Sequence, residues 1–174
     1  CGWMNKHCVI CTGEFEPRRM GQKTCSPICE KERKRQRRLI NERKLAIKPR
    51  RDWLKDSERA CNAYIRFRDR HGVCISCGRQ LGEHFHAGHF RSVGAAPHLR
   101  FNELNVHGQC AHCNTYNGGN LIGYRKGLAE RYGTELVEYL ENYNAPSRWS
   151  IDECKEIIDY YKTKLKELKE VDCS

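Results

Sequence analysis

The stretch His84–Ser92 ("HFHAGHFRS") places three histidines, a glycine and an arginine within nine residues. It lies between two Cys-x-x-Cys pairs, Cys74/Cys77 and Cys110/Cys113. Imidazole can bind a metal ion, and because its pKa is about 6.5 it can also act as a general base near neutral pH. The stretch is therefore either part of a catalytic metal site or a polar loop between zinc ligands.

Two cysteine quartets have the spacing of structural zinc sites. A Cys-x-x-Cys pair suits a thiolate knuckle, and four thiolates complete a tetrahedral Zn²⁺ site. Disulfides are the alternative in an oxidising compartment, but no secretory feature is recognisable, so zinc is favoured. We therefore expect two structural Zn²⁺ ions, one bound by Cys8, Cys11, Cys25 and Cys29 and the other by Cys74, Cys77, Cys110 and Cys113.

The first quartet predicts a zinc finger of the treble-clef type over residues 1–30. Its first two cysteines would lie in a hairpin and its last two at the start of a helix, with Ser26 as the N-cap and Pro27 at the first helical position. A segment this short cannot bury enough apolar surface to fold alone, so the metal would supply the folding free energy.

A strongly basic block follows the finger. Residues 31–51 carry eleven Lys and Arg against two Glu, a net +9 of the chain's +10. Such a run is often a solvated helix or a disordered arm, but beside zinc modules it favours a nucleic-acid partner. It offers few apolar anchors for a membrane surface, and no apolar run is long enough to predict a membrane span. We assign residues 31–58 to a basic helix and linker, with DNA phosphate contacts from Arg33, Lys34, Arg37 and Arg38.

Apolar periodicity predicts further helices on both sides of the histidine-rich segment. One ends near Gly72, one covers 121–132 before Gly133, and a short one covers 134–142. Ser150-x-x-Glu153 is typical of a capping box and starts the C-terminal helix of segment 146–174, whose apolar stripe would form core or a dimer seam. The fold class is therefore α+β, with residues 59–145 forming a domain around the second quartet. Cys61 and Cys154 are expected to be buried thiols, and Cys1 and Cys173 have no assigned role.

The order of polar residues around the second quartet resembles a known motif. A strand carrying His86 and His89 is followed by a loop, then Asn105, then the last cysteine pair with Asn114 leading into a helix. This arrangement resembles the HNH nuclease motif, the ββα-metal finger, in which zinc knuckles often brace a catalytic hairpin. The stretches "CISCG", "AGHFRS", "LRFNELNVHGQCAHCN" and "GNLIGYR" are similar to the NinG (Rap) recombination endonuclease family of lambdoid phages, and the resemblance covers most of the chain.

The resemblance implies a role for each of these residues. His89 matches the general base that takes a proton from the attacking water, and Asn105 matches the asparagine that pins the loop and orients the base. Asn114 matches the metal ligand at the helix start. Many HNH sites have Asp or His directly before the base, whereas this chain has Gly88, so His86 on the same strand face is the expected substitute ligand. The implied catalytic cofactor is Mg²⁺ or Mn²⁺.

The resulting expectation is a metal-dependent DNA endonuclease of HNH type, located in the cytoplasm of the bacterial host. The resemblance implies branched DNA, such as Holliday junctions and D-loops, as the substrate in phage recombination. The near two-fold symmetry of a junction favours a homodimer. Two alternatives stay open: a non-catalytic zinc-stapled DNA-binding or regulatory module, and a sequence-specific HNH restriction or homing nuclease.

Basic and histidine side chains near the proposed site are candidates for contacts with DNA. Phosphate contacts are expected from Arg91, Arg100, Arg125 and Lys126. His84 and His98 are assigned to loops or to substrate contacts.

Overall fold

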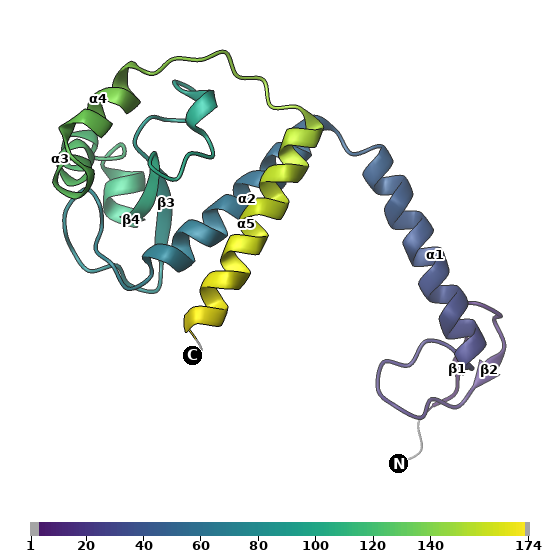
Figure 1. The fold of residues 1–174 in the computed structure, drawn as a ribbon. Coiled ribbons are helices and arrows are strands. Elements are labelled where there is room, and N and C mark those ends of the chain that lie inside the picture. Colours follow the sequence, from purple (N-terminus) through teal and green to yellow (C-terminus); the bar gives the residue numbers. More distant parts are fainter. Residues whose placement is uncertain (1–3, 173–174) are drawn as a thin grey trace. The chain divides into compact units, whose positions relative to one another are not determined.

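The computed structural model describes residues 4–172, and the chain divides into two compact units, Cys1–Pro49 and Arg50–Ser174 (Figure 1). This division differs from the segments expected from the sequence. One helix runs unbroken from Arg50 to Asp69, across the expected boundary at residue 58, and the C-terminal helix packs against it. Cys1 and Cys173, which had no assigned role, lie outside the described residues.

The N-terminal unit consists of a short hairpin and one long helix. Strand β1 (Lys6–His7) pairs antiparallel with β2 (Glu14–Phe15), and α1 covers Pro27–Ala46. The start of α1 is as predicted, because the Ser26 hydroxyl accepts a hydrogen bond from the backbone N–H of Cys29. No residue of α1 is buried, so the helix presents its basic side chains to solvent.

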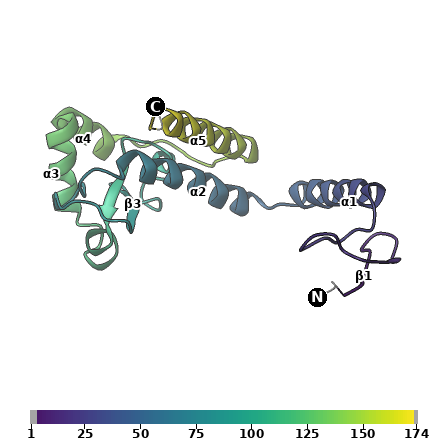
Figure 2. The same ribbon diagram turned by 90° about the horizontal axis from the view of Figure 1, so that it is seen from below.

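The second unit is built around a two-stranded antiparallel sheet. The sheet aligns His86 with Gln109 and Gly88 with His107. In Figures 1 and 2 the hairpin lies between the α2–α5 pair and the α3–α4 pair. In chain order the elements are α2 (Arg50–Asp69), β3 (Phe85–His89), the 3-10 turn η1 (Pro97–Leu99), β4 (Val106–Cys110), the π-helical turn η2 (His112–Tyr116), α3 (Leu121–Tyr132), α4 (Thr134–Asn142) and α5 (Ile151–Asp172).

Helix α5 packs alongside α2 in the same direction. Ser57 donates to the carbonyl of Cys154 at 2.9 Å in the first half of both helices, and Arg70 pairs with Asp172 at their ends. The predicted capping box is present: Glu153 accepts from the Ser150 N–H at 2.7 Å, and the Ser150 hydroxyl accepts from the Glu153 N–H at 3.1 Å.

The apolar stripe of α5 forms core within this chain. Its residues Cys154, Ile158 and Tyr161 are buried, and Tyr161 packs in one cluster with Cys61 and Ile65 of α2. Both cysteines are free buried thiols, as predicted, and burial raises the pKa of Cys61 to about 12. The stripe is therefore not an exposed seam for a second subunit.

A second cluster joins α3 and α4 to the segments around the hairpin. Leu128, Leu140 and Tyr124 are fully buried in it. Helix α3 lies directly on the second cysteine knuckle, because a Cβ on Gly123 or Gly127 would come within about 2 Å of the knuckle's carbonyl oxygens (2.1 and 1.9 Å). Both helices have the bounds that the sequence predicted. No helix within residues 4–172 is long and apolar enough to cross a bilayer.

Candidate functional site

The first cysteine quartet has the geometry of a zinc site. The sulfurs of Cys8, Cys11, Cys25 and Cys29 all lie within 4.8 Å of one another. Zn–S bonds of about 2.3 Å in a tetrahedron place neighbouring sulfurs about 3.8 Å apart. The Cys11–Cys25 and Cys25–Cys29 distances are 3.5 and 3.7 Å. The four thiols come from the β1–β2 hairpin and from the start of α1, as the sequence predicted.

The thiols of this quartet differ in acidity. The backbone N–H of Cys11 lowers the pKa of Cys8 to about 6. Hydrogen bonds with the neighbouring thiols, Cys11 first, raise the pKa of Cys25 to about 12. Four thiolates this close repel one another, so holding all of them deprotonated requires a cation such as Zn²⁺.

The second quartet clamps the base of the β3–β4 hairpin. Its sulfurs, from Cys74, Cys77, Cys110 and Cys113, also lie within 4.8 Å of one another. The backbone N–H of Cys110 donates to the Cys74 sulfur at 3.4 Å, and that of Cys113 donates to the Cys110 sulfur at 3.5 Å. These are the N–H contacts expected of a knuckle, and they join the segment after α2 to the end of β4 and to η2.

His89 stands at the end of β3, partly buried. Its Nε2 lies 3.0 Å from the carbonyl oxygen of Arg100. A carbonyl can only accept, so Nε2 carries the ring hydrogen and Nδ1 keeps a free lone pair. Burial lowers the pKa of His89, and the hydrogen bond to Arg100 offsets only part of this effect. The imidazole is therefore neutral near pH 7 and can accept a proton at Nδ1.

His86 and Asn114 lie side by side. The Nδ1 of His86 is 2.8 Å from the side-chain amide nitrogen of Asn114, which belongs to η2. Two adjacent ligands, each about 2.1 Å from one octahedral cation, lie about 3 Å apart. The pair therefore has a separation compatible with a shared divalent cation, once the Asn114 amide is rotated so that its oxygen faces the ion.

Asn105 is fully buried and fixes the segment that follows His89. Its Oδ1 accepts from the Arg91 N–H at 2.8 Å, and its Nδ2 donates to the carbonyls of Arg91 and Leu99 at 3.1 and 3.2 Å. Its own carbonyl accepts from the Phe90 N–H at 2.8 Å. The backbone directly after His89 is thus held to the residue that precedes β4.

A pocket of about 480 Å³ brings His89 and Asn114 together. His86 is not among its lining residues but contacts Asn114, which is. The rest of the wall comes from the segment after β3 and the loop before α3, namely Phe90, Arg91, Ser92, Val93, Ala95, Gly118, Gly119 and Leu121.

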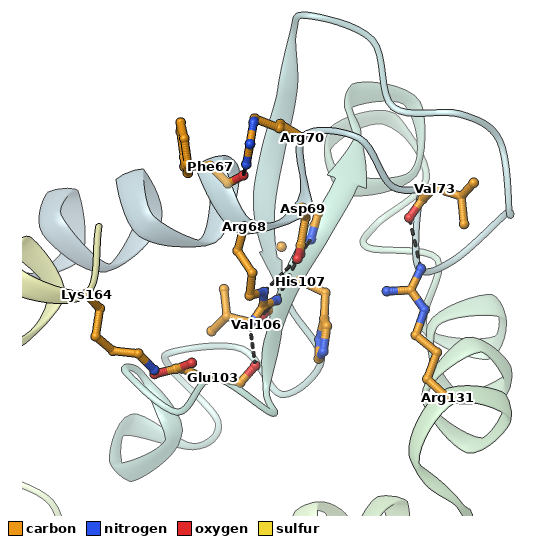
Figure 3. A network of polar contacts seen from close by, with 12 residues as sticks. Phe67, Arg68, Asp69, Arg70, Val73, Glu103, Val106, His107, Arg131 and Lys164 are labelled. Atoms are coloured by element: carbon orange, nitrogen blue, oxygen red, sulfur yellow. Dashed lines mark hydrogen bonds and ion pairs between the residues drawn. The ribbon is translucent and has the colours of Figure 1, made fainter. Parts of the chain in front are cut away.

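Polar contacts from α2 hold the hairpin in place (Figure 3). The Asp69 carboxylate accepts from the Gly108 N–H at 2.7 Å, and Arg68 donates to the Val106 carbonyl at 3.0 Å. Burial opposes ionisation of Asp69, but its ion pair with Arg68 at 2.6 Å outweighs burial and lowers the pKa. The same figure shows Lys164 with Glu103 at 2.6 Å and Arg131 with the Val73 carbonyl at 3.0 Å.

A buried chain of hydrogen bonds, which sequence reasoning missed, holds the hairpin from the α3 side. Tyr124 donates to the Gly88 carbonyl at 2.9 Å, so it accepts from Nδ1 of His107 at 3.2 Å. The Nε2 of His107 then accepts from Tyr132 at 3.1 Å. Burial lowers the pKa of His107 to about 3, so it stays neutral. Sequence position alone does not show whether a histidine in this segment is buried or exposed.

Three of the expected phosphate-binding arginines are engaged within the chain. Arg91 donates to the carbonyls of Leu140 and Tyr143 at 3.0 and 2.8 Å and to the Asn144 side chain at 3.1 Å. Arg125 pairs with Glu141 at 2.9 Å, and Arg33 pairs with Glu30 at 2.6 Å. These guanidinium groups would have to leave their partners to bind phosphate.

The other residues expected to contact DNA differ in their exposure to solvent. Lys34, Arg37 and Arg38 are exposed on α1, and Lys126 is exposed on α3 with Glu130 3.8 Å away. Arg100 is partly buried and supplies the carbonyl that binds His89. His84 is exposed, whereas the Nε2 of His98 bonds the Tyr143 carbonyl at 2.9 Å.

Comparison with known proteins defines the family. Residues 3–171 match the family model described as "Bacteriophage Lambda NinG protein", so the chain belongs to the NinG family. The protein "Protein ninG" of Escherichia phage lambda is 50% identical over 127 residues, which cover 73% of this chain and 62% of that protein. The protein of the same name from Salmonella phage P22 is 48% identical over 128 residues, covering 74% and 63%. No solved structure matches the chain.

The extent of the match differs among relatives. This chain spans less than two thirds of the lambda and P22 proteins. "Protein ninG" of Enterobacteria phage H19B is 40% identical over an alignment of 188 positions, which covers 94% of each chain. The family match therefore includes residues of both units of the chain, and the relatives named above are bacteriophage proteins.

Proposed function

We propose that the protein is a metal-dependent endonuclease of the HNH, or ββα-metal, type, which hydrolyses phosphodiesters in branched DNA during phage recombination. One observation carries this proposal. The β3–β4 hairpin and η2 bring His89 and Asn114 to one pocket and place His86 2.8 Å from the Asn114 amide. A polar loop between zinc ligands would not require this convergence.

His89 is the general base of the proposed reaction. It takes a proton from the attacking water at Nδ1, while Nε2 stays bonded to the carbonyl of Arg100. The lowered pKa keeps the ring unprotonated before the reaction, and the same carbonyl stabilises the imidazolium that forms. Asn105 holds the backbone after His89 and so maintains the direction of the ring.

His86 and Asn114 are the proposed ligands of Mg²⁺ or Mn²⁺. When bound, the cation offsets the negative charge that a phosphodiester gains in the transition state. Two protein ligands leave coordination positions for phosphate oxygens and water, as nucleases require. Their separation fits two adjacent ligands of one ion.

The remaining parts of the proposal concern binding. The two quartets hold structural zinc, and α1 contacts duplex arms through its exposed cations. Holliday junctions and D-loops are proposed as substrates from the family resemblance, and the host cytoplasm as the place of action. A homodimer would supply paired cuts, but it must use a surface other than the apolar stripe of α5, which is buried within the chain.

Cleavage of a four-way junction and of a linear duplex with the same arms tests the proposal. Zinc-loaded protein is assayed with Mg²⁺ or Mn²⁺ and without either, because EDTA would also remove zinc. Metal-dependent cleavage of the junction alone supports the proposal. Equal cleavage of the linear duplex at fixed sequences supports a sequence-specific nuclease, and binding without cleavage in either metal supports a non-catalytic DNA-binding module.

A further inference from the structure

The side-chain space of Gly88 is filled by another residue. Gly88 stands where many HNH sites have an acidic or imidazole ligand. A Cβ built on Gly88 would lie 2.1 Å from Oε1 of Gln109 and 3.0 Å from its Cβ. Gln109 is paired directly opposite His86 across the sheet, so both side chains emerge on the same face of the hairpin. The side-chain oxygen of Gln109 therefore occupies the space that a side chain at position 88 would fill.

The orientation of the Gln109 amide is determined by its partners. Its Nε2 donates to the carbonyl of Gly119 at 2.6 Å and to the hydroxyl of Ser76 at 2.7 Å. A carbonyl cannot donate, so the nitrogen must face Gly119 and the oxygen must face Gly88. The amide cannot be reversed without placing two oxygens against each other.

The oxygen of this amide is unpaired. Gln109 is fully buried, and within residues 4–172 its Oε1 has no hydrogen-bond partner. Buried amide oxygens are nearly always paired, because water that is lost on burial must be replaced. This oxygen lies beside Gly88, on the same face of the hairpin as His86, and it has a free lone pair that a cation could accept.

We infer that Gln109 replaces the missing ligand at position 88, and that its Oε1 binds the divalent cation held by His86 and Asn114. This inference rests on the proposed function. Mg²⁺ and Mn²⁺ favour oxygen ligands, whereas the His86 ligand is a nitrogen. Gln109 adds a neutral oxygen from the neighbouring strand, and its two fixed N–H bonds hold that oxygen in position before the cation arrives.

A structural role for Gln109 is the competing explanation. Its Nε2 joins the second cysteine knuckle, through Ser76, to the loop before α3, through Gly119. A brace of this kind depends on the nitrogen alone. A cation ligand depends on the oxygen. A variant that loses both atoms, compared with one that loses only a partner of the nitrogen, therefore separates the two roles.

The test is Mn²⁺ binding to the full zinc-loaded chain without DNA, measured by isothermal titration and by the EPR signal of free Mn²⁺. Gln109→Met keeps the side-chain volume but removes both polar atoms. Ser76→Ala removes a partner of the nitrogen and leaves the oxygen in place. Gly88→Asp combined with Gln109→Ala returns an oxygen ligand to position 88 in the space that the smaller residue opens. Zinc content is measured for every variant.

We expect Gln109→Met to weaken Mn²⁺ binding by about 10–100-fold, with two zincs retained, as removal of groups that support a metal site commonly does. Ser76→Ala should weaken Mn²⁺ binding much less than Gln109→Met does, because the bond to the Gly119 carbonyl still orients the amide. The double variant should bind Mn²⁺ more tightly than Gln109→Met. Wild-type affinity in Gln109→Met, or an equal loss in Ser76→Ala, would overturn the inference. A double variant with two zincs that binds no better than Gln109→Met would overturn it as well.

The failure of the proposed function gives a different pattern. His86→Ala is the control, because it removes a ligand that the proposed function already requires. If the wild type does not bind Mn²⁺, or if His86→Ala binds it equally well, the proposed cation site is absent and the assignment of Gln109 falls with it. If His86→Ala weakens binding and Gln109→Met does not, only the assignment of Gln109 is wrong.

Discussion

The two ring nitrogens of His89 have different surroundings, and the proposed chemistry depends on that difference. Nε2 is committed to the Arg100 carbonyl, so only Nδ1 can accept a proton. Burial lowers the pKa of the ring, which keeps this nitrogen unprotonated at neutral pH. A histidine fixed in this way is suited to the proposed proton transfer, and it adds little to phosphate affinity.

Replacing His89 by Ala should therefore reduce cleavage of a junction by about 10²–10⁴-fold while leaving DNA affinity nearly unchanged. His84→Ala is the matched control, since His84 is an exposed histidine of the same stretch. Single-turnover cleavage and binding in the absence of Mg²⁺ provide the two measurements. Wild-type turnover in His89→Ala would show that the active site is elsewhere.

His107 links stability to pH. Its pKa is about 3 in the folded protein because of burial, compared with 6.5 for an ordinary histidine. As pH falls below 6.5, the unfolded chain takes up a proton that the folded chain does not. The contribution of His107 to stability is thus complete above about pH 6.5 and is lost as pH falls toward 3.

Between pH 7 and pH 5 this effect should cost about 2 kcal/mol of unfolding free energy. His107→Gln, which can still donate and accept but does not titrate, should lose about 2 kcal/mol less than the wild type over the same range. Urea unfolding at both pH values measures the difference, and comparison with the variant cancels the pH dependence of zinc binding. Parallel losses in the two proteins would exclude His107 as the cause.

Spacing in the sequence was enough to predict residues that act through their type. The cysteine quartets follow from ligand spacing. His89 and Asn114 were indicated by the family resemblance, and the structure places both at one pocket. Residues that act through burial could not be predicted in this way. Gln109 and His107 lie two residues apart on one face of β4, and only the packed structure shows that both are fully buried.

At the scale of elements, the helices were predictable because their end signals are local. The N-cap Ser26, the box Ser150-x-x-Glu153 and the stop at Gly133 all occur where the sequence placed them. The packing partner of the apolar stripe of α5 could not be predicted, because such a stripe can pack against a helix of the same chain or against a helix of a second subunit. Contact with α2 resolves this alternative in favour of core.

Helix α1 has 20 residues, about 30 Å, and its cations face solvent. We expect Lys34→Gln, Arg37→Gln and Arg38→Gln together to flatten the salt dependence of DNA affinity by about 2–3 in log–log slope, because each lost phosphate contact removes about 0.9. Arg33 is left intact, since it already pairs with Glu30. Affinity measured from low to high salt gives both slopes.

The matched control removes the same charge elsewhere. Lys162, Lys166 and Lys169 are exposed on α5, and their joint replacement by Gln should leave the slope closer to the wild-type value. An equal change in both triple variants would mean that net charge, rather than α1, determines the salt dependence.

The whole molecule consists of two units, and each contains one cysteine quartet. In the first unit the quartet lies between α1 and a hairpin whose first strand has only two residues. Helix α1 has no buried residues, so little apolar packing stabilises this unit. In the second unit the quartet clamps a hairpin that two apolar clusters also hold. The two metal sites should therefore have different effects when they are lost.

Elemental analysis of the purified chain should find about two zincs per chain, since both quartets have tetrahedral spacing. Cys25→Ser should remove one zinc, unfold the first unit and weaken DNA binding, while cleavage persists at saturating protein because His89 and Asn114 belong to the other unit. Cys110→Ser should remove the other zinc and abolish cleavage, since Cys110 ends the strand that positions the hairpin. Fewer than two zincs in the wild type, with the eight cysteines in disulfides under native conditions, would contradict the zinc assignment. Loss of cleavage in both variants at saturating protein would show instead that the two units act as one.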